Sequence, residues 1–246
     1  MKPLISIITV CYNASKEIVP TLESVKQQTF TDFEHIIVDG ASSDSTLEIV
    51  KAHRLPSTII LSEKDNGIYD AMNKGLKMAK GEYVVFLNSG DSFHNNMVLE
   101  RVAEAAKDDN PGVIYGQTII VDRNRQYIST RHLIAPESLS YKSFSNGMVV
   151  CHQAFFVLTK LAPEFNLGYR FSSDFDWCIR ILQKSDKNVY LGSEPVIDYL
   201  NEGATTHNHT ASLKERFKIM VKYFGFMPTA LRHIKFLFRS IKRMQR

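Results

Sequence analysis

Polar side chains able to contact a nucleotide or a metal ion follow three apolar runs within the first 91 residues. These runs are residues 4–10, 34–38 and 83–87, and a polar loop follows each of them. The candidate contact residues at their ends are Val10, Tyr12, Asn13, Asp39, Asn88 and Asp91. A carboxylate can accept a hydrogen bond from a base N–H, and a tyrosine ring can stack on a base. The alternatives are structural: Asp39 would form an Asx turn, and Tyr12 would fill the edge of the core.

Two further polar segments carry candidate residues. Asp65 and Asn73 belong to a segment that opens a predicted helix, where Asp65 could serve as a cap and Asn73 could face solvent. Asp174 and Asp176 begin another predicted helix, whose dipole favours an ionised carboxylate at that end. Because residues two apart do not share a helix face, we expect at most one of these two to point toward a substrate. His152-Gln153 follows an apolar segment and could meet a second substrate or end a strand.

The elements that must position these residues alternate between strands and helices in the first half of the chain. Strands are predicted at residues 4–10, 34–38, 58–61, 83–87, 112–121, 126–130 and 196–200. Helices are predicted at residues 16–28, 46–53, 67–80, 97–107 and 173–184, with loops and short helices over 135–151. Alternating strands and helices form a parallel sheet, which binds ligands at the carboxyl ends of its strands. The three polar loops are therefore expected at one edge of one sheet.

Length and composition restrict the class of protein. The chain has 246 residues, of which 44% are hydrophobic and 23% charged, enough for one large α/β domain and not typical of disorder. It contains no run of about 20 apolar residues and begins without a secretory pattern. Three scattered cysteines are typical of a reducing compartment. We therefore expect a cytoplasmic protein.

The net charge of +4 is unevenly distributed along the chain. Nine Lys or Arg and no acidic residue follow Glu215, whereas the rest of the chain has 21 basic and 26 acidic residues. The apolar residues of this tail recur at helical spacing, beginning with Phe217, Met220, Val221 and Phe224. A basic amphipathic helix binds membrane surfaces, and the alternative is a helix packed on the domain. No stacking platform or recognition motif favours nucleic acid as a partner.

Four ordered segments resemble the family-2 glycosyltransferases, in particular the branch that builds bacterial surface polysaccharides. The segments are ISIITVCYN, VDGASSDST, SEKDNGIYDAMNKG and FLNSGD, and weaker similarity continues through CHQAFF and SSDFDWCIRI. The resemblance implies the GT-A nucleotide-sugar-binding fold, an α/β fold with a mostly parallel central sheet flanked by helices. We expect this domain at residues 1–210 and an amphipathic basic helical segment at residues 211–246.

The resemblance also implies roles for residues around a nucleotide-sugar donor. Asp39 would contact the base, and Asp65 and Asn73 would border the donor. Asp174 stands at the position of the catalytic base, which takes a proton from the acceptor hydroxyl. An arginine common in relatives is replaced by Met72.

A divalent cation, Mn²⁺ or Mg²⁺, is implied as the cofactor, because a leaving diphosphate needs hard-cation stabilisation. Asp91 corresponds to the family's usual metal ligand, whereas Asn88 and Gly90 replace carboxylates common in relatives. His207, or alternatively His209, is a candidate for a second metal or diphosphate contact.

The expected activity is inverting transfer from a UDP-linked sugar to a saccharide or lipid-linked saccharide, by a peripheral protein at the inner face of a bacterial membrane. A sugar nucleotidyltransferase is the first rival, but its Gly-rich phosphate loop is missing near the N-terminus. The segment Cys11-Tyr12-Asn13-Ala14-Ser15 excludes the glycine fingerprint of a dehydrogenase. A non-catalytic nucleotide-sugar-binding protein is the second rival, and a donor-hydrolysis assay separates it from an enzyme.

Overall fold

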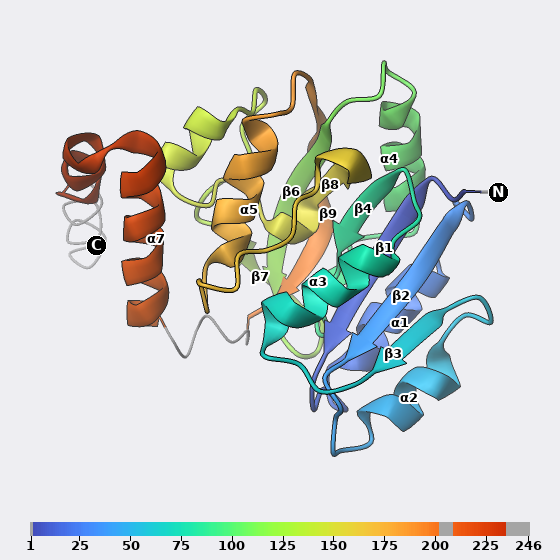
Figure 1. Ribbon diagram of the computed structural model, residues 1–246. Helices are drawn as coiled ribbons and strands as arrows, with labels where there is room; N and C mark the ends of the chain where they lie inside the picture. The colour runs from blue at the N-terminus through green and yellow to red at the C-terminus, as the bar shows by residue number, and fades with distance from the viewer. Residues whose placement is uncertain (1, 202–208, 235–246) are drawn as a thin grey trace.

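The computed structural model of the chain describes residues 2–201 and 209–234 (Figure 1). Within these residues, nine strands form one sheet in the order β3-β2-β1-β4-β8-β6-β9-β5, and β7 pairs with β6. The strands are β1 (Ile5–Cys11), β2 (Phe33–Asp39), β3 (Ile59–Ser62), β4 (Tyr83–Phe86), β5 (Ser92–Phe93), β6 (Val113–Val121), β7 (Tyr127–Thr130), β8 (Phe155–Leu158) and β9 (Asn188–Leu200). The α-helices are α1 (Ile18–Lys26), α2 (Thr46–His53), α3 (Ile68–Met78), α4 (Val98–Ala106), α5 (Ser173–Leu182) and α7 (His209–Phe224). The 3-10 helices are η1 (Tyr141–Asn146), η2 (His152–Ala154) and η3 (Thr159–Leu161).

The first four strands form the parallel half of the sheet. β1 pairs in parallel with β2 and β4, and β2 pairs in parallel with β3. Beyond β4 the sheet is mixed, because β8 runs antiparallel to both β4 and β6, whereas β6 and β9 are parallel. β8 begins directly after η2, whose first two residues are His152 and Gln153, so this pair precedes a strand and does not end one.

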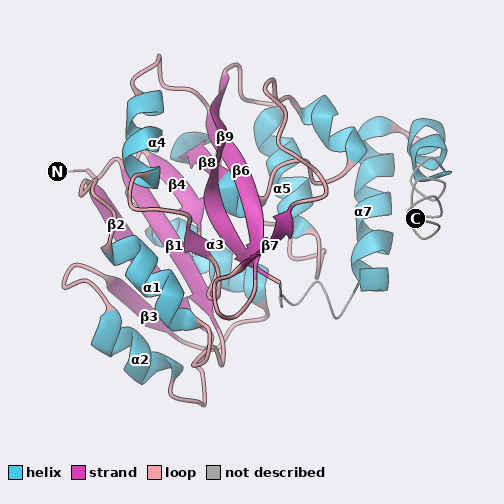
Figure 2. Cartoon of the chain, turned by 180° about the vertical axis from the view of Figure 1, so that it is seen from behind, coloured by secondary structure: helices cyan, strands magenta, loops and turns pink. Residues whose placement is uncertain are grey.

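Helices cover both faces of the sheet. Figure 1 shows α3 and α5 on one face, and Figure 2 shows α1, α2 and α4 on the other. The side chains of β1 alternate between the two layers: Ile8 belongs to the core with Met72 of α3, and Ile7 to the core with Leu99 of α4. Strands buried on both faces read as continuous apolar runs, which explains why the sequence showed them.

The helix α7 packs against α5 and η1 at the edge of the domain. Ile219 and Met220 are buried, and Phe224 stacks on Tyr141 with a centroid distance of 6.4 Å. The tail's apolar stripe therefore contacts the domain through Met220 and Phe224, which is the packed alternative considered above.

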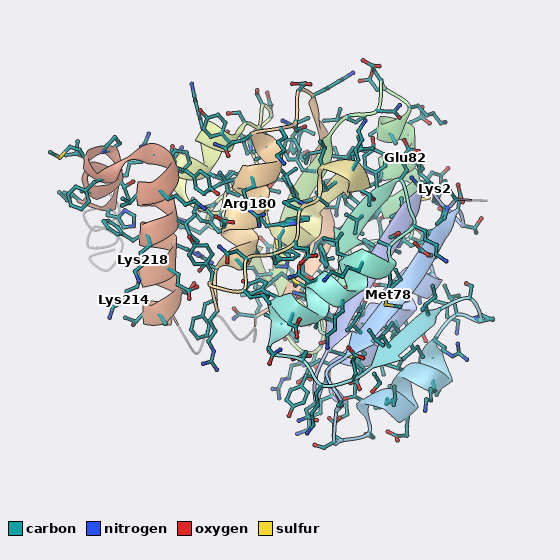
Figure 3. The ribbon with its side chains drawn as sticks, viewed as in Figure 1. Lys2, Met78, Glu82, Arg180, Lys214 and Lys218 are labelled. Atoms are coloured by element: carbon teal, nitrogen blue, oxygen red, sulfur yellow. The ribbon has the colours of Figure 1, made fainter. Side chains whose placement is uncertain are left out.

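A second helical stretch over residues 226–234 follows α7 and packs back on it. The ring of Phe217 contacts Phe226 edge-on, with centroids 6.2 Å apart. Lys214 and Lys218 are exposed on the side of α7 turned away from α5 (Figure 3). Among the described residues, no helix is both long and apolar enough to cross a membrane.

Candidate active site

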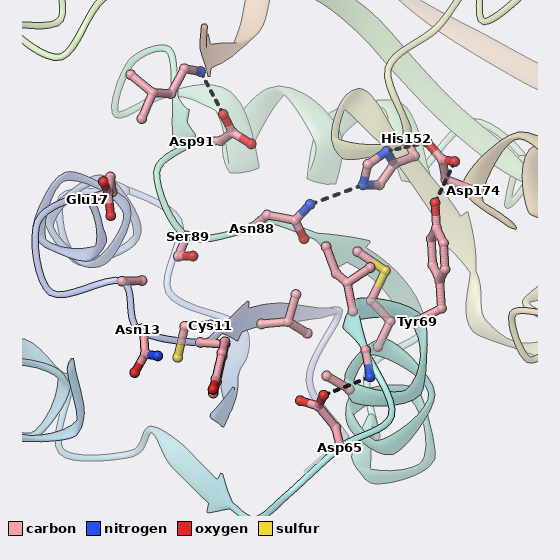
Figure 4. Close-up of a pocket in the computed structure, with 18 of the residues that line it drawn as sticks. Cys11, Asn13, Glu17, Asp65, Tyr69, Asn88, Ser89, Asp91, His152 and Asp174 are labelled. Carbon is pink, nitrogen blue, oxygen red and sulfur yellow. Dashed lines mark hydrogen bonds and ion pairs between the residues drawn. The ribbon is translucent and has the colours of Figure 1, made fainter. Parts of the chain in front are cut away.

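A pocket of about 590 Å³ opens at the carboxyl ends of β1 and β4, between α3 and α5 (Figure 4). Ligands of open α/β sheets bind in this position. The pocket brings together most of the residues predicted from the sequence, namely Val10, Tyr12, Asn13, Asp65, Asn88, Asp91 and Asp174. Among the described residues, its lining does not include Asp39 or Asn73. His207 lies outside the described residues.

The loop after β1 forms one wall of the pocket. The side chain of Tyr12 is 64% exposed, so it does not fill the core and its ring is accessible for stacking. Asn13 adopts a left-handed backbone conformation with φ of 48°, and its Oδ1 accepts a hydrogen bond of 2.9 Å from the backbone N–H of Ser43. This contact fixes the turn that presents Tyr12.

Asp39 stabilises that turn through hydrogen bonds. It is fully buried and accepts hydrogen bonds from Ser42 Oγ at 2.5 Å and Ser62 Oγ at 2.6 Å. Ser42 Oγ in turn accepts a 2.8 Å hydrogen bond from the N–H of Asn13. The structure therefore places Asp39 beneath the wall of the pocket, where its carboxylate orders the loop.

The helix α3 contributes to the pocket through its first turns. Asp65 accepts a 2.8 Å hydrogen bond from the N–H of Gly67, just before α3 begins. Asn73 turns the other way: its amide donates to Phe165 O at 3.0 Å and accepts from Phe165 N–H at 2.7 Å. Asn73 thus holds the segment around Phe165 against α3 and does not border the pocket.

Asp91 lies at the base of the pocket and is 5% exposed. Burial raises the pKa of Asp91 to about 6, although hydrogen bonds from Gln153 and the Leu200 N–H act in the opposite direction. The Leu200 N–H lies 2.7 Å from Oδ1, and the Gln153 amide donates to Oδ2. Gln153 also accepts a 2.7 Å hydrogen bond from the N–H of Asn88. Gln153 therefore holds the β4–β5 loop at two points, Asn88 and Asp91, and the Leu200 N–H binds the other oxygen of Asp91.

Asp174 enters the pocket from the first turn of α5. Its Oδ1 accepts a 2.9 Å hydrogen bond from the Tyr69 hydroxyl, and its Oδ2 lies 3.2 Å from His152 Nδ1 (Figure 4). Burial alone would raise the pKa of Asp174, but the hydrogen bond from His152, the charge of Arg216 and the Tyr69 hydroxyl lower it to about 2. The carboxylate is therefore ionised at neutral pH.

Asp176 points away from the pocket, as its position two residues further along α5 requires. It is fully buried, and its carboxylate accepts hydrogen bonds from Arg180 Nε at 2.6 Å, Lys222 Nζ at 3.1 Å and the Tyr223 hydroxyl at 2.8 Å. Asp176 therefore ties α7 to α5, and Asp174 is the carboxylate of this segment that a substrate could reach.

A second link joins α7 to the wall of the pocket. The carboxylate of Glu215 accepts the backbone N–H groups of Arg170 at 2.9 Å and Phe171 at 2.8 Å. Both Arg170 and Phe171 line the pocket.

One part of the pocket, around Asp91 and Asn88, offers oxygen atoms of the kind that bind a hard divalent cation. Among the described residues no group of three or more His, Cys, Asp and Glu side chains could hold an ion alone. Asp91 keeps unused lone pairs on its carboxylate, and within the described residues the buried Asn88 Oδ1 has no hydrogen-bond partner. Within the same residues, the lining has four carboxylates and two arginines, namely Glu17, Asp65, Asp91, Asp174, Arg123 and Arg170. An anionic ligand would meet a net negative pocket, so a cation bound with it by Asp91 and Asn88 fits this donor set.

Sequence reasoning missed Tyr69 as a partner of Asp174, although it lies within the segment SEKDNGIYDAMNKG. It also left His152 and Gln153 without a defined partner. The segment CHQAFF pointed to His152 and Gln153, but not to their partners. Gln153 and Asp91 are 62 positions apart, and Tyr69 and Asp174 are 105 positions apart, so these contacts form only in the folded chain.

Comparisons with known proteins show the family and the fold to which this chain is similar. The model of the family described as "Glycosyl transferase family 2" matches residues 6–162. The chain is 34% identical to a PGL/p-HBAD biosynthesis glycosyltransferase of Mycobacterium bovis over 185 residues, covering 72% of this chain and 69% of that protein.

The fold is similar to that of S. aureus TarS 1-349, solved in complex with UDP-GlcNAc, with a TM-score of 0.71 and 19% identity over 94% of this chain and 73% of TarS. The mannosyltransferase PcManGT from Pyrobaculum calidifontis, solved with GDP-Man and Mn²⁺, gives a TM-score of 0.65 and 16% identity over 95% of this chain and 69% of that chain. These similarities confirm the predicted GT-A fold.

Proposed function

This chain belongs to glycosyl transferase family 2, and we propose that it transfers a sugar from a UDP-linked donor to a saccharide or lipid-linked saccharide during assembly of a bacterial surface polysaccharide. The observation that carries the proposal is the position of Asp174, an ionised carboxylate in a pocket that the exposed ring of Tyr12 also lines. The UDP-GlcNAc complex of TarS supports a uridine donor.

Residues around the carboxyl ends of β1 and β4 would bind the donor. The Tyr12 ring would stack on the base, and Arg123 and Arg170 would attract the phosphates. Asp91 and Asn88 would hold a divalent cation, which would neutralise charge on the departing diphosphate. The Mn²⁺ bound by PcManGT supports this assignment.

The acceptor half of the reaction belongs to Asp174. The acceptor oxygen attacks the anomeric carbon from the face opposite the diphosphate, and the carbon–oxygen bond to the diphosphate breaks. The hydroxyl proton passes to the Asp174 carboxylate, which is ionised because its pKa lies near 2. One displacement inverts the anomeric configuration and leaves no covalent enzyme intermediate.

The test is a screen of UDP-, GDP- and TDP-sugars for release of the nucleoside diphosphate, with and without Mn²⁺ and with candidate acceptors. Turnover of one donor, with an inverted linkage in the NMR spectrum of the product, is the expected result. UDP binding in a calorimeter without turnover of any donor would contradict the proposal and favour the non-catalytic alternative.

A membrane-facing surface is proposed for the helical stretch over residues 226–234. Its large exposed apolar side chains are Phe226, Met227, Leu231 and Ile234. No acidic residue follows Glu215 in the sequence, so anionic headgroups would meet an uninterrupted basic segment. Each Lys or Arg near such a surface contributes about 1 kcal/mol. This contact would bring a lipid-linked acceptor to the pocket at the inner face of the membrane.

A further inference from the structure

His152 lies between the donor and acceptor sides of the pocket. Its Nδ1 is 3.2 Å from Asp174 Oδ2, and its Nε2 is 3.4 Å from the side-chain nitrogen of Asn88 (Figure 4). The imidazole side chain is 12% exposed, so few waters could replace these contacts. Gln153, the next residue of η2, donates a hydrogen bond to Asp91, another carboxylate of the pocket.

The two contacts define which nitrogen of His152 carries the proton. An amide nitrogen can only donate, so His152 Nε2 accepts the hydrogen bond from Asn88. In a neutral imidazole the proton then resides on Nδ1 and is donated to Asp174. The Tyr69 hydroxyl donates to the other oxygen of the same carboxylate at 2.9 Å. Both carboxylate oxygens of Asp174 therefore accept a hydrogen bond, and together these two contacts fix the orientation of the carboxylate plane.

We propose that His152 is a positioning residue for Asp174: Asn88 holds its Nδ1–H tautomer, and that N–H orients the carboxylate toward the acceptor hydroxyl. This inference rests on the proposed function of Asp174 as the base. It adds a physical link between the β4–β5 loop, on the donor side, and the group that receives the proton.

The first experiment compares His152→Leu, which removes the N–H, with His152→Asn, which keeps an N–H near the position of Nδ1. Loss of one hydrogen bond to a charged group corresponds to a roughly 10- to 100-fold effect. We expect kcat of His152→Leu to fall by about that factor, with KM for the donor unchanged within about twofold. His152→Asn should recover most of kcat. Equal losses in both variants, or a loss confined to KM, would overturn the proposal.

A double-mutant cycle separates positioning from a general structural role. If His152 acts only through Asp174, then His152→Leu should have almost no further effect on the residual rate of Asp174→Asn. Independent effects that multiply would overturn the proposal. Circular dichroism and thermal unfolding of each variant would verify that it is folded.

The tautomer is measurable without turnover. In protein labelled with ¹⁵N-histidine, the neutral form of His152 should show a protonated Nδ1 and an unprotonated Nε2, and Asn88→Ala should weaken that preference. An Nε2–H tautomer would refute this inference and leave the proposed function intact. Absence of turnover with every donor would refute the proposed function, while the tautomer measurement would still stand on its own.

Discussion

Replacing Asp174 with Asn should nearly abolish sugar transfer while leaving UDP binding intact. The substitution keeps the size and shape of the side chain but removes the group that accepts the proton. Loss of one general base typically lowers a rate by about 10²–10⁴-fold, and we expect kcat to fall within that range. A coupled assay for UDP release measures transfer, and calorimetry with UDP measures donor binding.

The same substitution should destabilise the fold by an amount that follows from the pKa. His152, Arg216 and Tyr69 outweigh burial and lower the pKa of Asp174 from 3.8 to about 2, which corresponds to about 2 kcal/mol of stabilisation when the group is ionised. Because the folded-state pKa is depressed, this contribution is present above about pH 4 and is lost as the pH falls through 2. The difference between wild type and variant in urea unfolding should therefore be about 2 kcal/mol at pH 7 and shrink toward pH 3.

Asp176→Asn is the matched control, because the same change is made two residues away on α5. Its carboxylate is buried against Arg180, Lys222 and Tyr223, outside the pocket. This variant should lose stability but keep transfer within a few-fold of wild type. The assignment of the base is wrong if Asp174→Asn keeps its activity, or if a folded Asp176→Asn protein loses it.

Three other outcomes test the remaining assignments. Asp91→Ala should weaken Mn²⁺-dependent UDP binding at least about tenfold in calorimetry; an unchanged metal effect would place the ion elsewhere. Asn73→Ala should lower the free energy of unfolding by about 1–3 kcal/mol, because two hydrogen bonds to Phe165 are lost, and should leave UDP affinity unchanged; weaker UDP binding at normal stability would make Asn73 a donor contact. Met227→Ser with Leu231→Ser should reduce co-sedimentation with anionic vesicles without lowering the melting temperature, since both side chains are exposed; binding equal to wild type would contradict the membrane surface.

The parallel half of the sheet could be predicted because three of its strands, β1, β2 and β4, are largely buried apolar runs that each end in a polar turn. The helix predicted at residues 46–53 is α2 with the same bounds. The second half gave weaker signals: β9 contains Gly192 and Pro195, and its pairing with β6 shifts register beside Pro195. β8 follows other apolar residues without a turn residue between them, so its start was not visible.

The candidate site could be predicted as a set of segments, whereas side-chain direction could not. Met72 lines the pocket, but Asn73, one residue further along α3, is rotated by about 100° and bonds Phe165 instead. Asp39 ends β2 as expected, yet its carboxylate accepts hydrogen bonds from Ser42 in the turn that follows and from Ser62 at the end of β3. The partners of Asp174 come from α3 and η2, which only the tertiary fold brings together.

The attachment of α7 restricts how this protein can be recombined with its relatives. Asp176 depends on Lys222 and Tyr223 of α7, and Glu215 of the same helix secures the backbone of residues 170–171. A buried carboxylate that loses its partners is strongly destabilising. A chimera that joins residues 1–210 to the tail of another glycosyltransferase must therefore supply a cation and a hydroxyl for Asp176 and a carboxylate for that backbone. Recombination between related genes should therefore keep the tail together with the catalytic domain, and crossovers should be favoured elsewhere in the chain.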